Sequence, residues 1–255
     1  MIFRRGSIKI FWQKSGVSVK ATEWRNAIGE LVRDHWRSAE VERYFSVKMN
    51  RRRAQIVIAQ LGIYIRHRRN LWAHVSANCP VLAVKQKILR HEYGEVIKDQ
   101  YAEGGHISLI IRQANAVGLT AEETLNAQPL ATTRAVLYAW SWITRTKHWV
   151  EGLAAVTATE WTNDDRLLGD LGGGHSSRMA KRWMDDMGLK WKDMPNFEVH
   201  RQADEDHSDM FLPCLAEFAT GEKEALALDA VRESLELYGL YREGIAKAMG
   251  KIPLA

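Results

Sequence analysis

HRQADEDH, residues 200–207, is the stretch on which the interpretation of this sequence depends, because it places His200, Asp204 and His207 in a His-x3-Asp-x2-His pattern. On an α-helix these three positions share one face and extend over about two turns. Two imidazoles and a carboxylate on one stripe can bind a metal ion, and the carboxylate shifts the preference towards harder ions such as iron or manganese. A solvated polar helix face is the alternative, since acidic residues also occupy positions 205, 206 and 209.

The composition is that of an ordinary globular protein of 255 residues, which is long enough to bury a substantial core. Ten Trp are spread along most of the chain, whereas a surface that stacks nucleic-acid bases would gather its aromatic residues together. The densest basic runs, at 51–53 and 66–69, come without any nucleic-acid-binding signature. We therefore expect solvated basic helix faces and no nucleic-acid partner.

Cysteine use and hydropathy indicate a reducing compartment and no membrane partner. Cys79 and Cys214 are far apart and form no metal or redox motif. Residues 1–20 intersperse basic with apolar side chains, which a secretory signal does not do, and no uncharged run approaches the ~18 residues of a membrane span. We expect a cytoplasmic protein.

Helical periodicity dominates the sequence, and strand signals are nearly absent. We expect one all-α domain, a helical bundle over residues 21–250, after an N-terminal extension at 1–20. Inward-facing side chains of such a bundle can build a metal site. The predicted helices are 21–37, 39–47, 51–76, 81–103, 107–117, 121–127, 131–161, 166–187 (interrupted or bent by glycines 172–174), 197–218 and 222–249.

Other helices should supply further ligands if the 200–207 stretch binds metal. Glu160 lies at the apolar end of a predicted helix, where a carboxylate is costly unless it is paired or metal-bound. Glu92 and His106 would be about 21 Å apart on one unbroken helix, too far to share a site. They can converge only if the chain loops out between them, which the glycines at 94, 104 and 105 make plausible.

In their order and separations, these residues resemble the heme-oxygenase-like diiron oxygenase and oxidase family. The resemblance covers residues 24–239 and includes GLTAEE, residues 118–123. It implies a heme-oxygenase-like fold. Two separations are longer than in that family. The gap from Glu92 to His106 leaves Glu95 as an alternative first carboxylate, and the gap from Glu160 to His200 implies an insertion around 172–195. The metal ligands that the resemblance implies are Glu92, His106, Glu160, His200, Asp204 and His207.

The resemblance also implies a reaction. Such a site would hold two Fe(II) ions per chain and use O2 as co-substrate to oxidise a small molecule. Amino acids and fatty acids are frequent substrates in the family, and we expect an amino acid or its derivative here. The resemblance implies N-oxygenation, desaturation or oxidative C–C cleavage as the outcome of the reaction. It also implies that the protein forms a homodimer.

Three alternatives stay open at the level of sequence. A cofactor-independent oxidase of the pyrroloquinoline-quinone-synthase type, or a thiaminase II, would keep the fold without metals, although the latter needs a nucleophilic Cys. Heme oxygenase proper would need a proximal His, for which His35 is the candidate. A non-enzymatic helical binding protein would use the basic segment 51–69.

Overall fold

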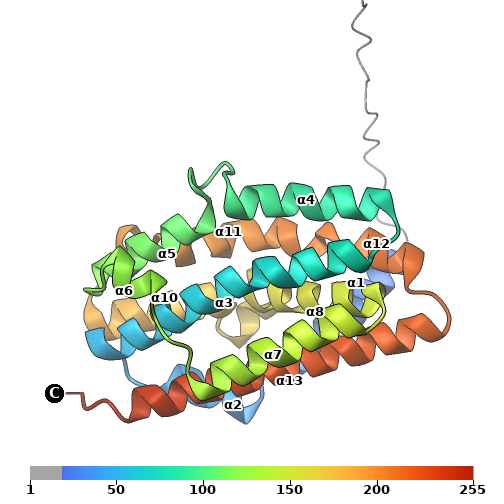
Figure 1. Ribbon diagram of the computed structural model, residues 1–255. Coiled ribbons are helices and arrows are strands. Elements are labelled where there is room, and N and C mark those ends of the chain that lie inside the picture. Colours follow the sequence, from blue (N-terminus) through green and yellow to red (C-terminus); the bar gives the residue numbers. More distant parts are fainter. Residues whose placement is uncertain (1–18, 255) are drawn as a thin grey trace, which may run out of the picture.

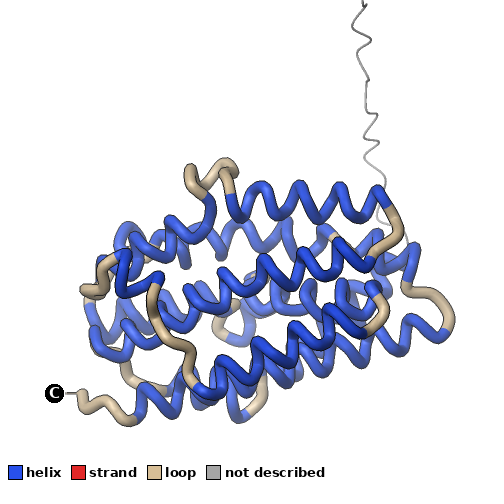
Figure 2. Tube along the Cα trace, in the orientation of Figure 1, coloured by secondary structure: helices blue, strands red, loops and turns tan. Residues whose placement is uncertain are grey.

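The structure is a computed structural model that describes residues 19–254, with the side chains of residues 19 and 203–206 left out of the description. Helices make up most of this part of the chain (Figures 1 and 2). Residues 19–254 form no strand, and an isolated bridge joins Lys98 to Glu103. The all-α prediction is confirmed, whereas the predicted N-terminal extension lies almost wholly outside the described residues. None of the described helices is long and apolar enough to cross a membrane.

The α-helices are α1 Val19–Trp36, α2 Ala39–Ser46, α3 Arg51–Asn78, α4 Leu82–Val96, α5 Gly105–Ala116, α6 Ala121–Leu125, α7 Ala131–Thr146, α8 Trp149–Glu160, α9 Asp165–Leu168, α10 His175–Met187, α11 Pro195–Met210, α12 Leu212–Phe218 and α13 Glu222–Gly250, with 3-10 turns at Trp161–Asn163, Gly169–Leu171 and Trp191–Asp193.

The central element of the bundle is α8, which packs against α13, α7, α3 and α11. Every residue of α8 is buried except Glu151, and most of them are small or apolar. Small residues allow close approach: a Cβ on Gly152 would lie 3.2 Å from the Val75 side chain on α3. In Figure 1, α4, α5 and α11 lie on one side of α3, and α7 and α13 lie on the other. Burial on all sides places the C-terminal residue of α8, Glu160, inside the protein.

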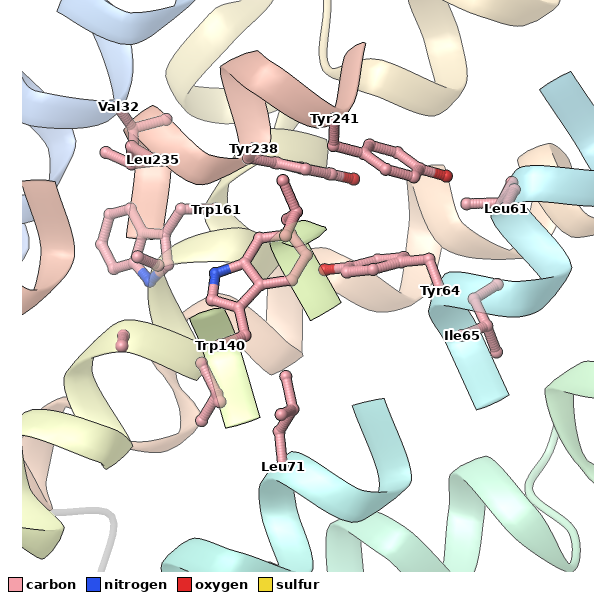
Figure 3. Packing of buried hydrophobic residues seen from close by; sticks show 14 of the residues in the cluster. Val32, Leu61, Tyr64, Ile65, Leu71, Trp140, Trp161, Leu235, Tyr238 and Tyr241 are labelled. Carbon is pink, nitrogen blue, oxygen red and sulfur yellow. The ribbon is translucent and has the colours of Figure 1, made fainter. Parts of the chain in front are cut away.

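A cluster of aromatic rings joins three helices beside α8. The Tyr64 ring on α3 lies 5.3 Å from Trp140 on α7, and 5.4 and 5.6 Å from Tyr238 and Tyr241 on α13 (Figure 3). Such offset and tilted ring pairs stabilise a core beyond the area that they bury. The Trp140 indole donates a hydrogen bond to Ser234 at 3.0 Å, so its polar edge is satisfied.

Several predicted helices are shorter than expected or divided. The helix predicted over 81–103 ends at Val96, because Asp99 accepts hydrogen bonds from the backbone of Tyr101 and Ala102 and forms a turn. The helix predicted over 131–161 is divided after Thr146, where His148 caps the start of α8.

The other two long predictions are also divided. That over 197–218 breaks at Phe211, ahead of a proline in the first turn of α12, where proline is well tolerated. The helix predicted over 166–187 is divided into α9, a 3-10 turn and α10, and the interruption lies at the expected glycines. Gly172 and Gly173 there have φ of +91° and +92°, which side chains disfavour.

Candidate metal centre

Histidine and carboxylate side chains from α4, α5, α8 and α11 meet inside the bundle. The loop between α4 and α5 allows this, because α4 ends at Val96 and α5 begins at Gly105. The chain reverses closely at that point, since a Cβ on Gly105 would lie 2.5 Å from the carbonyl oxygen of Val96. The looping-out that the sequence required is therefore present, and it brings His106 back beside α4.

Glu95 lies at the middle of this cluster. Its carboxylate is 3.0 Å from His106 Nδ1, 3.8 Å from His207 Nδ1 and 3.1 Å from Arg69 Nη1. Burial alone would raise the pKa of the Glu95 carboxyl, but Arg69 and His106 together outweigh burial and hold that pKa well below its usual range. Glu95 is therefore an anion in the interior, as a metal ligand must be.

His106 is fully buried and is held from both sides. Its Nε2 lies 2.9 Å from Asp99 Oδ2, and its Nδ1 faces Glu95. Burial favours the neutral ring, yet the two carboxylates raise the pKa of His106 to about 9. A carboxylate on the far nitrogen is the usual way in which a metal-binding histidine is oriented. Asp99 is thus placed to fix His106 towards Glu95.

Glu160 reaches the cluster from the end of α8. Its Oε1 lies 2.5 Å from Arg68 Nη2 and 3.6 Å from His91 Nε2. Burial raises the pKa of the Glu160 carboxyl, but Arg68 and His91 lower it far more, so the carboxylate is charged. Glu160 thus lies beside His91 in the interior, and its predicted role as a metal ligand stays a prediction.

The two histidines of α11 face the cluster. The His200 ring lies 4.9 Å from the His106 ring, and the His207 ring lies 5.0 Å from the His91 ring, centroid to centroid. The predicted helix over HRQADEDH is present, so the backbone of Asp204 lies on the same helix, one turn after His200. The Asp204 side chain lies outside the described residues.

Glu92, which the sequence suggested as the first carboxylate ligand, lies beside His91. Its carboxylate contacts His91 Nδ1 at 3.2 Å and Arg69 Nη1 at 3.0 Å, at the edge of the cluster. Glu95, the alternative first carboxylate, faces His106 instead. The sequence reasoning also missed His91, whose ligand atom lies within 4.8 Å of those of Glu95 and His207. The i, i+4 spacing of His91 and Glu95 was the available signal.

A small cavity of about 40 Å³ adjoins the cluster. Arg68, Glu95, Glu160 and His200 line one part of it, and the rest is lined mainly by polar residues and tyrosines. A wider groove of about 530 Å³ lies between α1 and α13 and contains none of the cluster residues. The other lining residues of the small cavity are Leu61, Tyr64, Ile65, Arg69, Thr159, Asn163, His175, Ser176, Asn196 and Tyr238.

His35 lies at the wider groove and is already engaged. Its Nε2 is 2.8 Å from Nη1 of Arg242, a fully buried guanidinium that can only donate. Burial and Arg242 lower the pKa of His35 to about 3, so the neutral ring accepts that hydrogen bond. The nitrogen that a heme iron would need is occupied.

Comparisons with known proteins agree with this fold. Residues 56–239 match the family described as iron-containing redox enzymes. No curated protein matches the chain. A domain of unknown function with a heme oxygenase-like fold from Shewanella denitrificans is 17% identical, with a TM-score of 0.70 over 90% of this chain and 93% of the other.

Two further solved structures are similar. A CADD-like protein of unknown function from Nostoc punctiforme is 13% identical, with a TM-score of 0.72 over 91% of this chain and 99% of that one. A TenA homologue from Pseudomonas syringae pv. tomato is 12% identical, with a TM-score of 0.62 over 92% and 99%. At these identities the similarity shows the fold, which is heme-oxygenase-like, as the sequence predicted.

Proposed function

Because the chain belongs to the family of iron-containing redox enzymes, we propose that it is an O2-dependent oxidoreductase that binds two Fe(II) ions. The observation that carries the proposal is the buried cluster around Glu95, where histidines from three helices converge on carboxylates. The ligands we propose are Glu95, in the place first assigned to Glu92, with His106, Glu160, His200, Asp204 and His207.

The donor set fits iron. Imidazole and carboxylate together suit ferrous ions, and two such ions supply electrons for the reduction of O2. Several anions in the interior are costly without cations beside them, and in the metal-free protein Arg68, Arg69 and the His106 ring, whose pKa is raised to about 9, compensate for them. A bound metal ion would supply the same compensation. Asp99 orients His106, while Trp72 and Phe211 pack on His91 and keep water from this side of the cluster.

We propose a compact polar substrate, an amino acid or its derivative. The cavity beside the cluster, at about 40 Å³, has room for only a few water-sized groups, so it favours a small substrate over a long acyl chain. Its lining includes the polar residues Arg68, Asn163 and Ser176. The Oδ1 of Asn196 there is buried and has no hydrogen-bond partner among the described residues, so it can accept a bond from a substrate amine.

Neither cysteine supports a thiaminase reaction. Cys79 and Cys214 are buried, and burial raises the pKa of both thiols, which disfavours the nucleophilic thiolate. Neither residue lines the cavity beside the cluster.

Anaerobic titration of metal-free protein with Fe(II) tests the proposal, followed by mixing with O2 and measurement of its consumption. We expect two irons per chain and O2 uptake that candidate amino acids accelerate. Glu160→Ala and His200→Ala should reduce iron binding, whereas Glu30→Ala, which changes an exposed carboxylate on α1, should leave it intact. Absence of iron uptake by the unaltered chain would refute the function.

A further inference from the structure

We propose that His91 is an additional metal ligand of this chain and that Glu92 orients it. The inference rests on the proposed function, because it concerns the same metal centre. It goes beyond the six ligands that the sequence pattern suggests, and it reassigns Glu92 from ligand to partner of a ligand.

The contacts of the His91 ring fix which nitrogen can bind a metal. Nδ1 lies 3.2 Å from Glu92 Oε1, and Glu92 is itself held by Arg69 Nη1 at 3.0 Å. A carboxylate accepts from an N–H, so this contact places a proton on Nδ1 and directs Nε2 into the cluster. Metal-binding histidines are commonly held in this way, with a carboxylate on the nitrogen opposite the ion.

The second nitrogen is not satisfied by a hydrogen bond. Among the described residues, Nε2 of His91 is buried without a hydrogen-bond partner, and its contact with a carboxylate, Oε1 of Glu160, is a long one of 3.6 Å. A buried polar atom left in this state destabilises a fold unless a ligand or ion binds it. Packing of the ring against Trp72 and Phe211 accounts for its burial but does not satisfy Nε2.

His91 also has suitable co-ligands. His91 and Glu95 are one turn apart on α4 and share a face, and their ligand atoms lie within 4.8 Å of each other and of that of His207. Atoms bound to one ion at about 2 Å each are at most about 4 Å apart, so shifts of about 1 Å complete the site. Two histidines and one carboxylate are a ligand set typical of ferrous oxygenases.

Co(II) is a suitable probe, because it reports coordination without turnover. Metal-free protein is titrated with Co(II), and the exchangeable, paramagnetically shifted ring N–H signals are counted by proton NMR. We expect His91→Gln to remove one such signal and to weaken the binding of one of the two ions more than 100-fold. Glu92→Gln should keep the signal at a changed shift and weaken binding by about 10- to 100-fold.

Matched variants separate the alternatives. Glu95→Gln serves as the reference for loss of a carboxylate ligand, and His74→Gln, on α3 and bonded to Thr144, is the control that should change nothing. A His91→Gln protein with unchanged affinity and all its signals would overturn the inference. If Glu92→Gln impairs binding as much as Glu95→Gln, Glu92 is a ligand and the orienting role is wrong.

Two other results are also decisive. Circular dichroism shows whether His91→Gln folds. If it does not fold, the inference is tested by the His91 ring N–H signal in Glu92→Gln, which should change its shift. If no signal changes its shift in Glu92→Gln, the inference is refuted. If the unaltered chain binds no Co(II) and no Fe(II), the proposed function fails together with this inference.

Discussion

Arg68 and Glu160 form an ion pair inside the protein, with side chains only 7% and 9% exposed. Burial of two charges is costly, and the pair is tolerated because the guanidinium also donates to Tyr64 Oη, Thr159 Oγ1 and the carbonyl of Val156. Arg68 therefore compensates for Glu160 in the metal-free protein. A bound cation would supply the same compensation.

We expect Arg68→Met to destabilise the metal-free protein by about 3 to 5 kcal/mol, because Glu160 would be left as a buried charge without its guanidinium partner. The measurement is the free energy of unfolding in urea under metal-free conditions. The double variant Arg68→Met, Glu160→Gln should recover most of this loss. Arg232→Met, which breaks an exposed pair with Asp229, should cost less than about 1 kcal/mol. Equal losses for both arginine variants would contradict the expectation.

At the scale of elements, the break between α4 and α5 decides whether a metal centre can form. The glycines at 104 and 105 both have positive φ. One carboxylate oxygen of Asp99 accepts a backbone hydrogen bond within the turn, and its other oxygen contacts His106. The same short loop therefore sets the chain direction and orients a ligand. Two features require glycine at position 105. Its φ of +68° disfavours a side chain, and a Cβ there would clash with the carbonyl of Val96.

We expect Gly105→Ala to cost about 2 to 5 kcal/mol in stability, since it adds a backbone clash to an unfavourable φ. The change should also weaken metal binding, because it displaces His106. Gly188→Ala is the matched control: its φ is +70°, but a Cβ there meets nothing within 4 Å, so the cost should be about 1 kcal/mol. Urea unfolding measures the loss of stability, and Co(II) titration measures the loss of metal affinity. Equal losses in Gly105→Ala and Gly188→Ala would rule out the clash.

The sequence allowed prediction of the helical class and of most helices, because their apolar periodicity is strong. It did not locate the break before His148, because no glycine or proline marks it and the cap there is a histidine, an unusual capping residue. The convergence of several candidate ligands from different helices could be predicted from their order in the sequence, and their role as metal ligands stays a prediction. The choice between Glu92 and Glu95, and the role of His91, depend on the direction in which α4 turns its side chains, which spacing alone does not give.

At the scale of the whole molecule, burial keeps several histidines outside the proposed ligand set neutral. Burial is the largest cause that lowers the pKa of His35, His67, His74 and His175, which lie on three different helices. Each must gain a proton when the chain unfolds in mild acid. Their combined effect is to make the folded state less stable as the pH falls below 6.5.

His35 is the clearest case, because its pKa falls from 6.5 to about 3 on folding. The unfolded chain binds more protons between these values, so the contribution of His35 is complete above pH 6.5 and is lost as the pH falls towards 3, by at most about 1.4 kcal/mol per pH unit. Between pH 8 and pH 5 this amounts to about 2 kcal/mol.

His35→Gln keeps an acceptor for Arg242 but does not titrate. Urea unfolding of both proteins at the two pH values should therefore show a decrease smaller by about 2 kcal/mol in the variant. An equal decrease in both proteins would mean that His35 does not remain neutral in the folded state.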